Sequence, residues 1–300
     1  MGNVPLPQVT REAIRELLAA KSSSGLSRGT LQNVLIPLRA MLNAAVDDGK
    51  IPANPAVRLG RYSRGLTERE ARKVAALTAA ELSHLLATAE KDYPDHADLL
   101  TVLAWTGLRL GEACGLQWGD LDFKGHFLEV SRSIHYRAHR VLIGAPKSGQ
   151  ARRVDLPAVL VARLRTRQSV WQAEAAVEGR ELSPWVFPAP TDPNKPINPA
   201  HLRFKVWYRL LRHAGLRAVR LHDLRHTYAS LLLQAGEPIA YVREQLGHSS
   251  IQVTVDIYGH FIPGSNREAV NRLAAMTGAS VGTEGEAQET GPARLELARN

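Results

Sequence analysis

The sequence predicts a mainly α-helical protein with two domains, the second of which also contains a small antiparallel β-sheet. Apolar residues recur at helical spacing through most of the 300-residue chain. Only residues 123–157 contain several short segments that are typical of strands. A proline-containing stretch followed by a basic one marks a boundary near residue 65. We therefore predict a helical domain over residues 1–65, a mixed α+β domain over residues 66–276 and a flexible tail over residues 277–300.

The first domain is predicted to contain two helices. Thr10 is placed to cap the first helix, whose apolar residues share one face. Ser27 is placed to cap the second helix. Pro37 falls inside that second helix, where its missing N–H should kink the helix or break it locally. Pro52 and Pro55 then end the regular structure of this domain.

The second domain is predicted to begin with a helix that Thr78 and Glu81 cap together. A pair of helices follows, and Gly107 is the expected break between them. Helices resume at Ala158. Further along, Gly247 is expected to end another helix, and Ser249 is expected to cap the next one together with Gln252 three residues later.

The predicted sheet lies between these helical regions. Residues 123–157 contain three expected antiparallel strands, "HFLEVSRSIHY", "RVLIGAP" and "ARRVDLP", with a polar turn before the third. Residues 183–199 form a long proline-rich connection, after which helices continue to about Met276. The sequence contains no internal repeat.

Charge indicates the class of partner. The formal net charge is +9, and residues 1–73 alone hold 12 basic against 6 acidic residues. Such an excess favours polyanions, and the many arginine side chains suit phosphate oxygens. No run of about 18 apolar residues and no secretory signal is present, so we expect no membrane span and a cytoplasmic, nucleoid-associated location. Cys114 is the only cysteine, which excludes an intramolecular disulfide.

The segment "LHDLRHTYAS" allows two interpretations. His222 and His226 stand four residues apart with Asp223 after the first, which approaches the helix of zinc hydrolases. A zinc site would need a third ligand, and it would place a metal ion beside the positive charge of Arg225. In the alternative interpretation, Arg225 and His222 share a helical face and bind one phosphate group.

Three other segments carry groups that suit phosphate chemistry. "WTGLRLGEACGLQW" places Arg109 at a helix break, with Glu112 one turn later to orient it or to cap the backbone. "APKSGQARRVDLP" places Lys147 at a hairpin tip. "LGHSSIQVTVDIYGH" places His248 after a helix and Tyr258 ten residues later.

Together these segments resemble the active site of the tyrosine recombinase, or phage integrase, family. The family's order is Arg, Lys, His-x-x-Arg, His and Tyr, which matches Arg109, Lys147, His222, Arg225, His248 and Tyr258. The resemblance extends over roughly residues 10–275 and implies the tyrosine recombinase fold, with residues 1–65 as a core-type DNA-binding domain. Family members usually have one more helix before the segment that begins here at Thr10, so this domain is expected to be short at its N-terminus.

The resemblance also implies a mechanism. Tyr258 would attack a DNA phosphate, release a 5′-hydroxyl and form a 3′-phosphotyrosyl bond. Arg109 and Arg225 would hold the non-bridging oxygens, and Lys147 would protonate the leaving oxygen. His222 would accept the proton of Tyr258, and its ordinary pKa of about 6.5 suits that duty. No cofactor, metal or ATP is implied.

His248 would donate a further hydrogen bond to the phosphate. His226 is expected to be buried or to support its neighbours. Arg152 and Arg153 suit either contacts with DNA phosphates or a solvated strand end. The implied partners are double-stranded DNA, three further copies of the chain in a tetramer and an accessory directionality factor.

Three alternatives remain at this stage. One is a DNA-binding relative that has lost catalysis, although none of the six positions is missing. Another is a metal-dependent hydrolase built on "HDLRH", which a chelator would inactivate. The third is a type IB topoisomerase, which would relax DNA without site preference.

Overall fold

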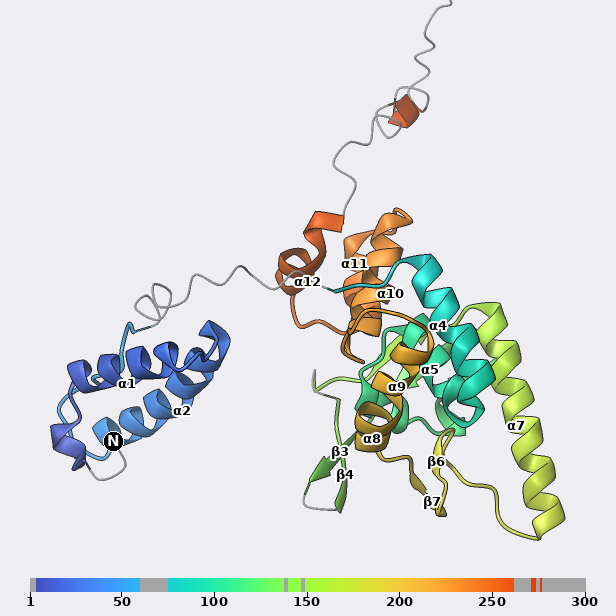
Figure 1. Cartoon of the computed structure of the whole chain (residues 1–300), viewed down its shortest axis with the longest axis horizontal. Helices are drawn as coiled ribbons and strands as arrows, with labels where there is room; N and C mark the ends of the chain where they lie inside the picture. Colours follow the sequence, from blue (N-terminus) through green and yellow to red (C-terminus); the bar gives the residue numbers. More distant parts are fainter. Residues whose placement is uncertain are drawn as a thin grey trace, which may run out of the picture. The chain divides into compact units, whose positions relative to one another are not determined.

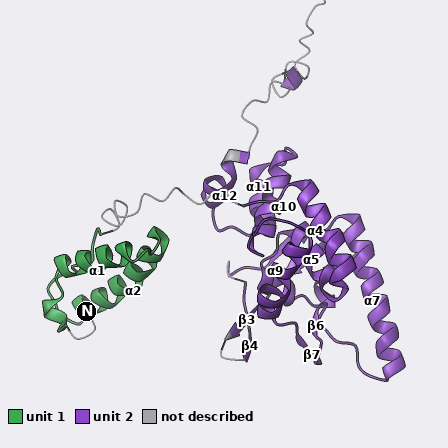
Figure 2. Ribbon diagram, in the orientation of Figure 1, with its two compact units in different colours: residues 1–73 green, residues 74–300 purple. Residues whose placement is uncertain are grey.

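The computed structural model describes most of the chain and divides it into two compact units, residues 1–73 and residues 74–300 (Figure 2). The sequence predicts a boundary near residue 65, and the structure divides after Lys73, eight residues later. The described residues are 4–59, 75–137, 140–146, 149–261, 271–273 and 276. The predicted tail, residues 277–300, and the predicted site residue Lys147 lie outside them. No helix among the described residues is long and apolar enough to cross a bilayer.

The first unit is a helical hairpin. It contains the short 3₁₀ turn η1 (Leu6–Gln8) and the helices α1 (Arg11–Ser23) and α2 (Arg28–Asp47). The predicted caps are confirmed, because the Thr10 and Ser27 hydroxyls accept hydrogen bonds from the backbone three residues later. The two helices bury one apolar stripe each, which together form the core of this unit: Ile14, Leu18, Leu31, Leu35 and Leu42.

Pro37 does not break α2, which runs without interruption from Arg28 to Asp47. Of the two expected effects, a kink or a local break, the break does not occur. Pro37 and Asn33, whose carbonyl would have accepted the missing hydrogen bond, both lie on the exposed face of the helix. Water can satisfy that carbonyl, so the helix continues through the proline.

The second unit is mainly helical, and its two small antiparallel hairpins lie at the lower edge in the view of Figure 1. Helix α5 packs against α4, α7 and α10. The Thr78–Glu81 capping box at the start of α4 is confirmed, and Gly107 breaks the chain between α5 and α6 with a φ of 61°. The helices of this unit are α4 (Ala79–Asp92), α5 (Pro94–Thr106), α6 (Leu110–Cys114), α7 (Ala158–Glu178), α8 (Pro199–His201), α9 (Trp207–His213), α10 (Asp223–Gln234), α11 (Ile239–Leu246) and α12 (Ile251–Tyr258).

Three shorter helical turns complete it. They are the 3₁₀ turns η2 (Trp118–Asp120) and η4 (Gly259–Phe261), and the π-helical turn η3 (Leu202–Val206) between α8 and α9. The predicted cap of α12 was one residue out of place. Because this helix begins at Ile251, its cap is Ser250, whose hydroxyl accepts a hydrogen bond from the Val253 backbone.

The three predicted segments contain four strands, and one further short strand precedes them in the chain; the five strands form two separate sheets. β1 (Leu121–Asp122), β2 (Phe127–Val130) and β5 (Arg152–Asp155) form one antiparallel sheet in the order β1-β2-β5. β3 (Ser133–Arg137) and β4 (Arg140–Gly144) form a hairpin of their own between β2 and β5 in the chain. The segment expected as one strand splits because Val130 is buried against β5, while Ile134 is buried beside a different partner, Ile143.

The proline-rich connection also contains a short hairpin. β6 (Pro188–Ala189) and β7 (Asp192–Pro196) pair in antiparallel fashion, although no strand was expected there. A two-stranded ribbon has only edges, where a proline removes no necessary hydrogen bond.

Candidate active site

Helix α10 presents the His-x-x-Arg pair from its first turn. His222 is the residue before the helix and is exposed, whereas Arg225 is only 3% exposed. The Arg225 guanidinium donates to the Gly107 carbonyl at 2.7 Å through Nη1 and to the Leu246 carbonyl at 2.5 Å through Nη2. These two oxygens lie at the break before α6 and at the end of α11. Arg225 therefore joins three predicted active-site segments.

Glu112 holds Arg109 in place. The Arg109 backbone N–H donates to Glu112 Oε2 at 2.9 Å, and its Nη1 donates to Oε1 at 2.8 Å. Glu112 therefore both caps the start of α6 and orients the side chain of Arg109, so both suggested roles are confirmed. The Arg109 side chain remains 25% exposed and can reach a ligand.

Arg152 is the second partner of Glu112. It donates to Oε2 at 2.8 Å and to Oε1 at 3.2 Å, and its Nε donates to the Gln245 carbonyl at 3.1 Å. Its side chain is only 9% exposed, so it is not a solvated strand end. Arg152 is the first residue of the strand that follows the lysine turn, but this position alone does not indicate Glu112, 40 residues away, as its partner.

Burial of Glu112 opposes its ionisation, but hydrogen bonds and charge from Arg152 and Arg109 outweigh burial and lower its pKa to about 2. Glu112 is thus a carboxylate at neutral pH. The local charge is still positive, because one carboxylate faces the guanidinium groups of Arg109, Arg152 and Arg225. Burial, followed by the charge of Arg109, lowers the pKa of Arg225 to about 9, so Arg225 stays protonated at neutral pH.

His248 lies in the break between α11 and α12. Gly247 ends α11 with a φ of 64°, as predicted. A methyl group added at Gly247 would lie 2.7 Å from Arg152 Cδ, so the arginine passes directly over this glycine. His248 Nδ1 lies 2.9 Å from the Thr254 hydroxyl, and its ring is parallel to that of Tyr258 with centroids 6.3 Å apart.

Tyr258 ends α12 and is 1% exposed. Its hydroxyl lies 2.7 Å from His226 Nδ1. The family resemblance implied that His222 accepts the proton, but the ring of His222 contacts His226, with centroids 5.1 Å apart. The four-residue spacing of the two histidines on one helix was the signal for a shared face. It did not reveal which of them faces α12.

Burial shifts the pKa of each titratable group around Tyr258. It raises the pKa of Tyr258 to about 12, although the charge of Arg225 acts in the opposite direction. It lowers the pKa of His226. It also lowers the pKa of His222 to about 4, with help from His226 and Arg225, although part of this ring stays exposed. The pKa of His248 falls to about 4 through burial and the charges of Arg225 and Arg109.

Arg109, His222 and Arg225 line one pocket of about 460 Å³. The remaining walls come from β3, through residues including Tyr136, and from the segment around η3, through Arg203 and Phe204. His248 and Arg152 line a neighbouring polar pocket of about 570 Å³. The pocket with Arg109 and Arg225 therefore presents two guanidinium groups and a histidine to a ligand, which suits an oxyanion such as a phosphate diester.

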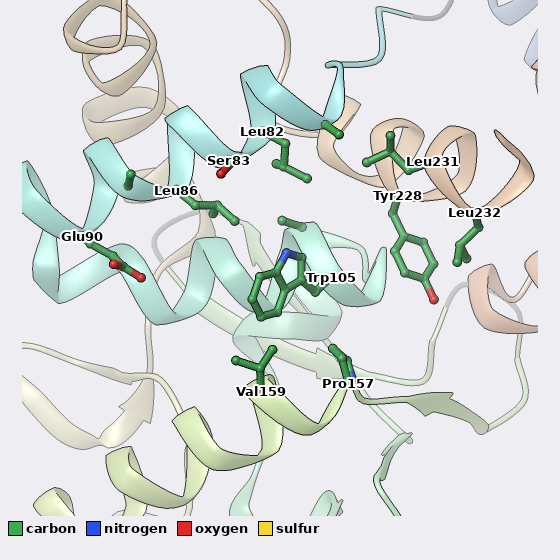
Figure 3. A pocket seen from close by; sticks show the side chains of 13 residues that line it. Leu82, Ser83, Leu86, Glu90, Trp105, Pro157, Val159, Tyr228, Leu231 and Leu232 are labelled. Carbon is green, nitrogen blue, oxygen red and sulfur yellow. The ribbon is translucent and has the colours of Figure 1, made fainter. Parts of the chain in front are cut away.

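A third pocket, of about 730 Å³, has a different character (Figure 3). Trp105, Tyr228 and apolar side chains of α4 and α10 line it. None of the described site residues predicted from the sequence lies on it, and its apolar walls offer no cationic group to a phosphate.

The structure gives the zinc interpretation no support. Asp223 accepts hydrogen bonds from the backbone and the guanidinium of Arg220, and His226 is engaged with Tyr258. Among the residues that the structure describes, no three histidine, cysteine, aspartate or glutamate side chains are grouped to hold a metal ion.

Comparisons with known proteins find related sequences. Residues 75–263 match the model of the family described as "Phage integrase family". The chain is 30% identical over 264 residues to a "Tyrosine recombinase XerC-like" protein of Caldanaerobacter subterraneus subsp. tengcongensis, an alignment that covers 83% of this chain and 66% of that one. It is 26% identical over 273 residues to the ICEBs1 integrase of Bacillus subtilis, which covers 89% and 71% of the two chains.

The fold is similar to that of solved recombinases. The Tn1549 transposon integrase in complex with transposon right end DNA superposes with a TM-score of 0.73 at 22% identity, over 90% of this chain and 87% of that one. A dimer of λ integrase bound to a core site gives a TM-score of 0.59 at 17% identity, over 84% and 83% of the two chains.

Proposed function

The chain belongs to the phage integrase family, and on that premise we propose that it is a site-specific DNA recombinase that cuts and rejoins DNA through a 3′-phosphotyrosyl intermediate. The observation that carries the proposal is the meeting of Arg109, His222 and Arg225 at one pocket. Tyr258 is linked to that pocket through His226, which contacts both the Tyr258 hydroxyl and the ring of His222. The proposed catalytic residues are Arg109, Lys147, His222, Arg225, His248 and Tyr258, to which we add His226.

The proposed reaction is an exchange of one phosphate ester for another. The Tyr258 oxygen forms a bond to phosphorus, and the bond from phosphorus to the 5′-oxygen breaks. The proton of Tyr258 passes to His226, whose Nδ1 lies 2.7 Å from the hydroxyl. Lys147 supplies a proton to the departing 5′-oxygen. Rejoining runs these steps in reverse with a new 5′-hydroxyl, so the bond energy is retained without ATP.

The remaining cationic groups stabilise the transition state. Arg109 and Arg225 donate to the non-bridging oxygens, on which charge grows as the phosphorus becomes five-coordinate. Their geometry is set in advance, by Glu112 for Arg109 and by two main-chain carbonyls for Arg225. His222 and His248 are neutral at pH 7, given pKa values of about 4, and can donate hydrogen bonds to the same phosphate.

Duplex DNA is the proposed substrate. Among the solved relatives, the Tn1549 integrase is in complex with transposon right end DNA, and λ integrase is bound to a core site. In this chain, the net charge of +9 supports the same kind of partner. We assign residues 1–65 to DNA binding and residues 66–276 to catalysis. Four protomers on two duplexes, an accessory directionality factor and action at the cytoplasmic nucleoid complete the proposal.

The experiment that tests this function traps the covalent intermediate. Nicked duplexes tiled across the DNA on both sides of the gene are incubated with the protein in EDTA, and denaturing gels are read for a protein–DNA band. We expect a band with the wild type and none with Tyr258→Phe, with the DNA attached through its 3′-phosphate. Retained duplex binding without any band would favour a non-catalytic relative, and activity only with added zinc would favour a hydrolase.

A further inference from the structure

One helical segment beside the active-site pocket has an unusual geometry. α8, η3 and α9 follow one another without a break, and the middle turn, Leu202–Val206, is π-helical. Such wide turns are rare and are frequently found at functional sites. Leu202, Val206 and Trp207 are buried. The turn therefore directs Arg203, Phe204 and Lys205, which lie between them in sequence, toward solvent.

Phe204 is the most conspicuous side chain of this turn, because it is 68% exposed. A large aromatic ring in water forgoes the favourable free energy of burial, and this one is not simply remote surface. Phe204 and Arg203 line the pocket of about 460 Å³ that also contains Arg109, His222 and Arg225. From β3, Tyr136 lines the same pocket and is 41% exposed.

The positive charge of the segment from α8 to α9 favours a polyanion as its partner. Residues 199–213 contain four arginine or lysine residues and no aspartate or glutamate. All four are exposed, and none of them forms an ion pair with another described residue: Arg203, Lys205, Arg209 and Arg212. A row of free cations with exposed aromatic rings, Phe204 and Tyr208, is the usual footprint of a nucleic-acid surface.

We propose that Phe204 is a specificity-determining residue, whose ring contacts the base pair next to the bond that Tyr258 cuts, while Arg203 holds the adjacent backbone phosphate. The inference rests on the proposed function, because it places the cut phosphate between Arg109 and Arg225. A ring on the wall of that same pocket is placed to reach the nucleotide beside the phosphate. It cannot hydrogen-bond a phosphate, but it can pack on a thymine methyl group or enter a flexible base step.

The proposal makes cleavage depend on the neighbouring bases through a single ring. The test uses nicked duplexes in which each of the four base pairs is placed, in turn, at the two positions on either side of the cut bond. The rate of adduct formation is measured for the wild type, for Phe204→Ala and for Val177→Ala. Val177 is a matched control, because it is an apolar side chain 89% exposed on a different helix, α7.

We expect the wild type and Val177→Ala to cleave the best and worst of these duplexes with rates that differ by roughly tenfold or more. In Phe204→Ala that range should shrink to about threefold or less, through slower cleavage of the preferred duplex. Because the ring is exposed, the melting temperature should not change. An unchanged order and range of rates in Phe204→Ala would overturn the proposal.

Arg203 provides a second readout. Arg203→Gln should weaken binding to all the duplexes alike and reduce the slope of log K against log salt by about 0.9. An unchanged slope would remove the proposed phosphate contact. Failure of the proposed function would look different from either result, because the wild type itself would then form no adduct that depends on Tyr258.

Discussion

Arg152 and Glu112 form a bidentate ion pair that is almost completely buried. The two N–O distances are 2.8 and 3.2 Å, and the side chains are 9% and 0% exposed. The same carboxylate orients Arg109, and the same guanidinium donates to the Gln245 carbonyl two residues before Gly247. Through this pair, the strand that follows the lysine turn is tied to the first arginine and to the break that carries His248.

Replacing Arg152 by glutamine should therefore affect both stability and catalysis. Glu112 would keep only Arg109 as a charged partner, and removing one member of a buried pair costs about 3–5 kcal/mol of unfolding free energy. Urea unfolding measures this loss, and adduct formation measures the effect on Arg109. Arg153→Gln is the matched control, since the neighbouring guanidinium is exposed and lies over the Phe127 ring. Equal effects of the two variants would contradict the assignment.

Acid should weaken the fold through Glu112. Its pKa is about 2 in the native protein against an ordinary value of 4.5, so the unfolded chain binds more protons between these values. The contribution of Glu112 to stability is fully present above pH 4.5 and is lost as the pH falls toward 2. Unfolding curves between pH 6 and 2 should show a shallower decline in Glu112→Gln than in the wild type. Parallel declines would mean that other groups account for the acid sensitivity.

His226 should be more important than His222 for activating the nucleophile. A general base contributes roughly 10²–10⁴-fold to the rate, and His226 is the residue in contact with the Tyr258 hydroxyl. We expect His226→Asn to slow adduct formation by about 100-fold with duplex binding retained, and His222→Asn to have a smaller effect. The reverse order would restore the assignment made from the sequence.

Two histidines should titrate at unusually acidic pH. The pKa values of His222 and His248 are both about 4, mainly because of burial, so both rings are neutral above pH 5. A bound phosphate would favour the imidazolium form and raise both values. NMR titration of the free protein should give two midpoints near 4 that move upward when a DNA duplex is added. Midpoints near 6.5 in the free protein would show that the surroundings of the two rings do not lower their pKa values.

Gly247→Ala should damage the site more than the backbone strain alone explains. Any residue other than glycine pays roughly 1–2 kcal/mol for a left-handed conformation, and Gly179 at the end of α7 shares it with a φ of 63°. An added methyl group meets no atom within 4 Å at Gly179, whereas at Gly247 it meets Arg152 at 2.7 Å. Gly179→Ala should therefore lower stability only, and Gly247→Ala should also slow adduct formation. Equal adduct rates in the two variants would argue against a role for this close approach.

The sequence was informative where one local pattern decides the outcome. The caps at Thr10, Ser27 and Thr78 and the break at Gly107 each depend on residues within one turn of the chain. The order of the six site residues along the chain could also be recognised from the sequence, because recognising it requires no information about which residues are in contact. Lys147 lies outside the described residues and stays a prediction.

Contacts between distant segments could not be read in the same way. Arg152 and Glu112 are 40 positions apart, and Tyr258 meets His226 across 32. Nothing in the local pattern distinguishes His226 from His222, because which side of α10 faces α12 depends on how α10, α11 and α12 pack. The separate β3–β4 hairpin was missed for a similar reason, since both halves of the longer segment have the composition of strands.

The two main-chain oxygens that hold Arg225 have a consequence for the thermodynamics of substrate binding. An arginine side chain loses about 2 kcal/mol of rotamer entropy when it is fixed in one position. For Arg225 this loss occurs during folding, because Gly107 and Leu246 immobilise the guanidinium before any DNA arrives. The guanidinium that the phosphate meets is therefore already ordered. The free energy of the hydrogen bonds formed at binding is not reduced by a loss of side-chain entropy. Any variant that frees this side chain transfers the loss from the folding equilibrium to the binding equilibrium.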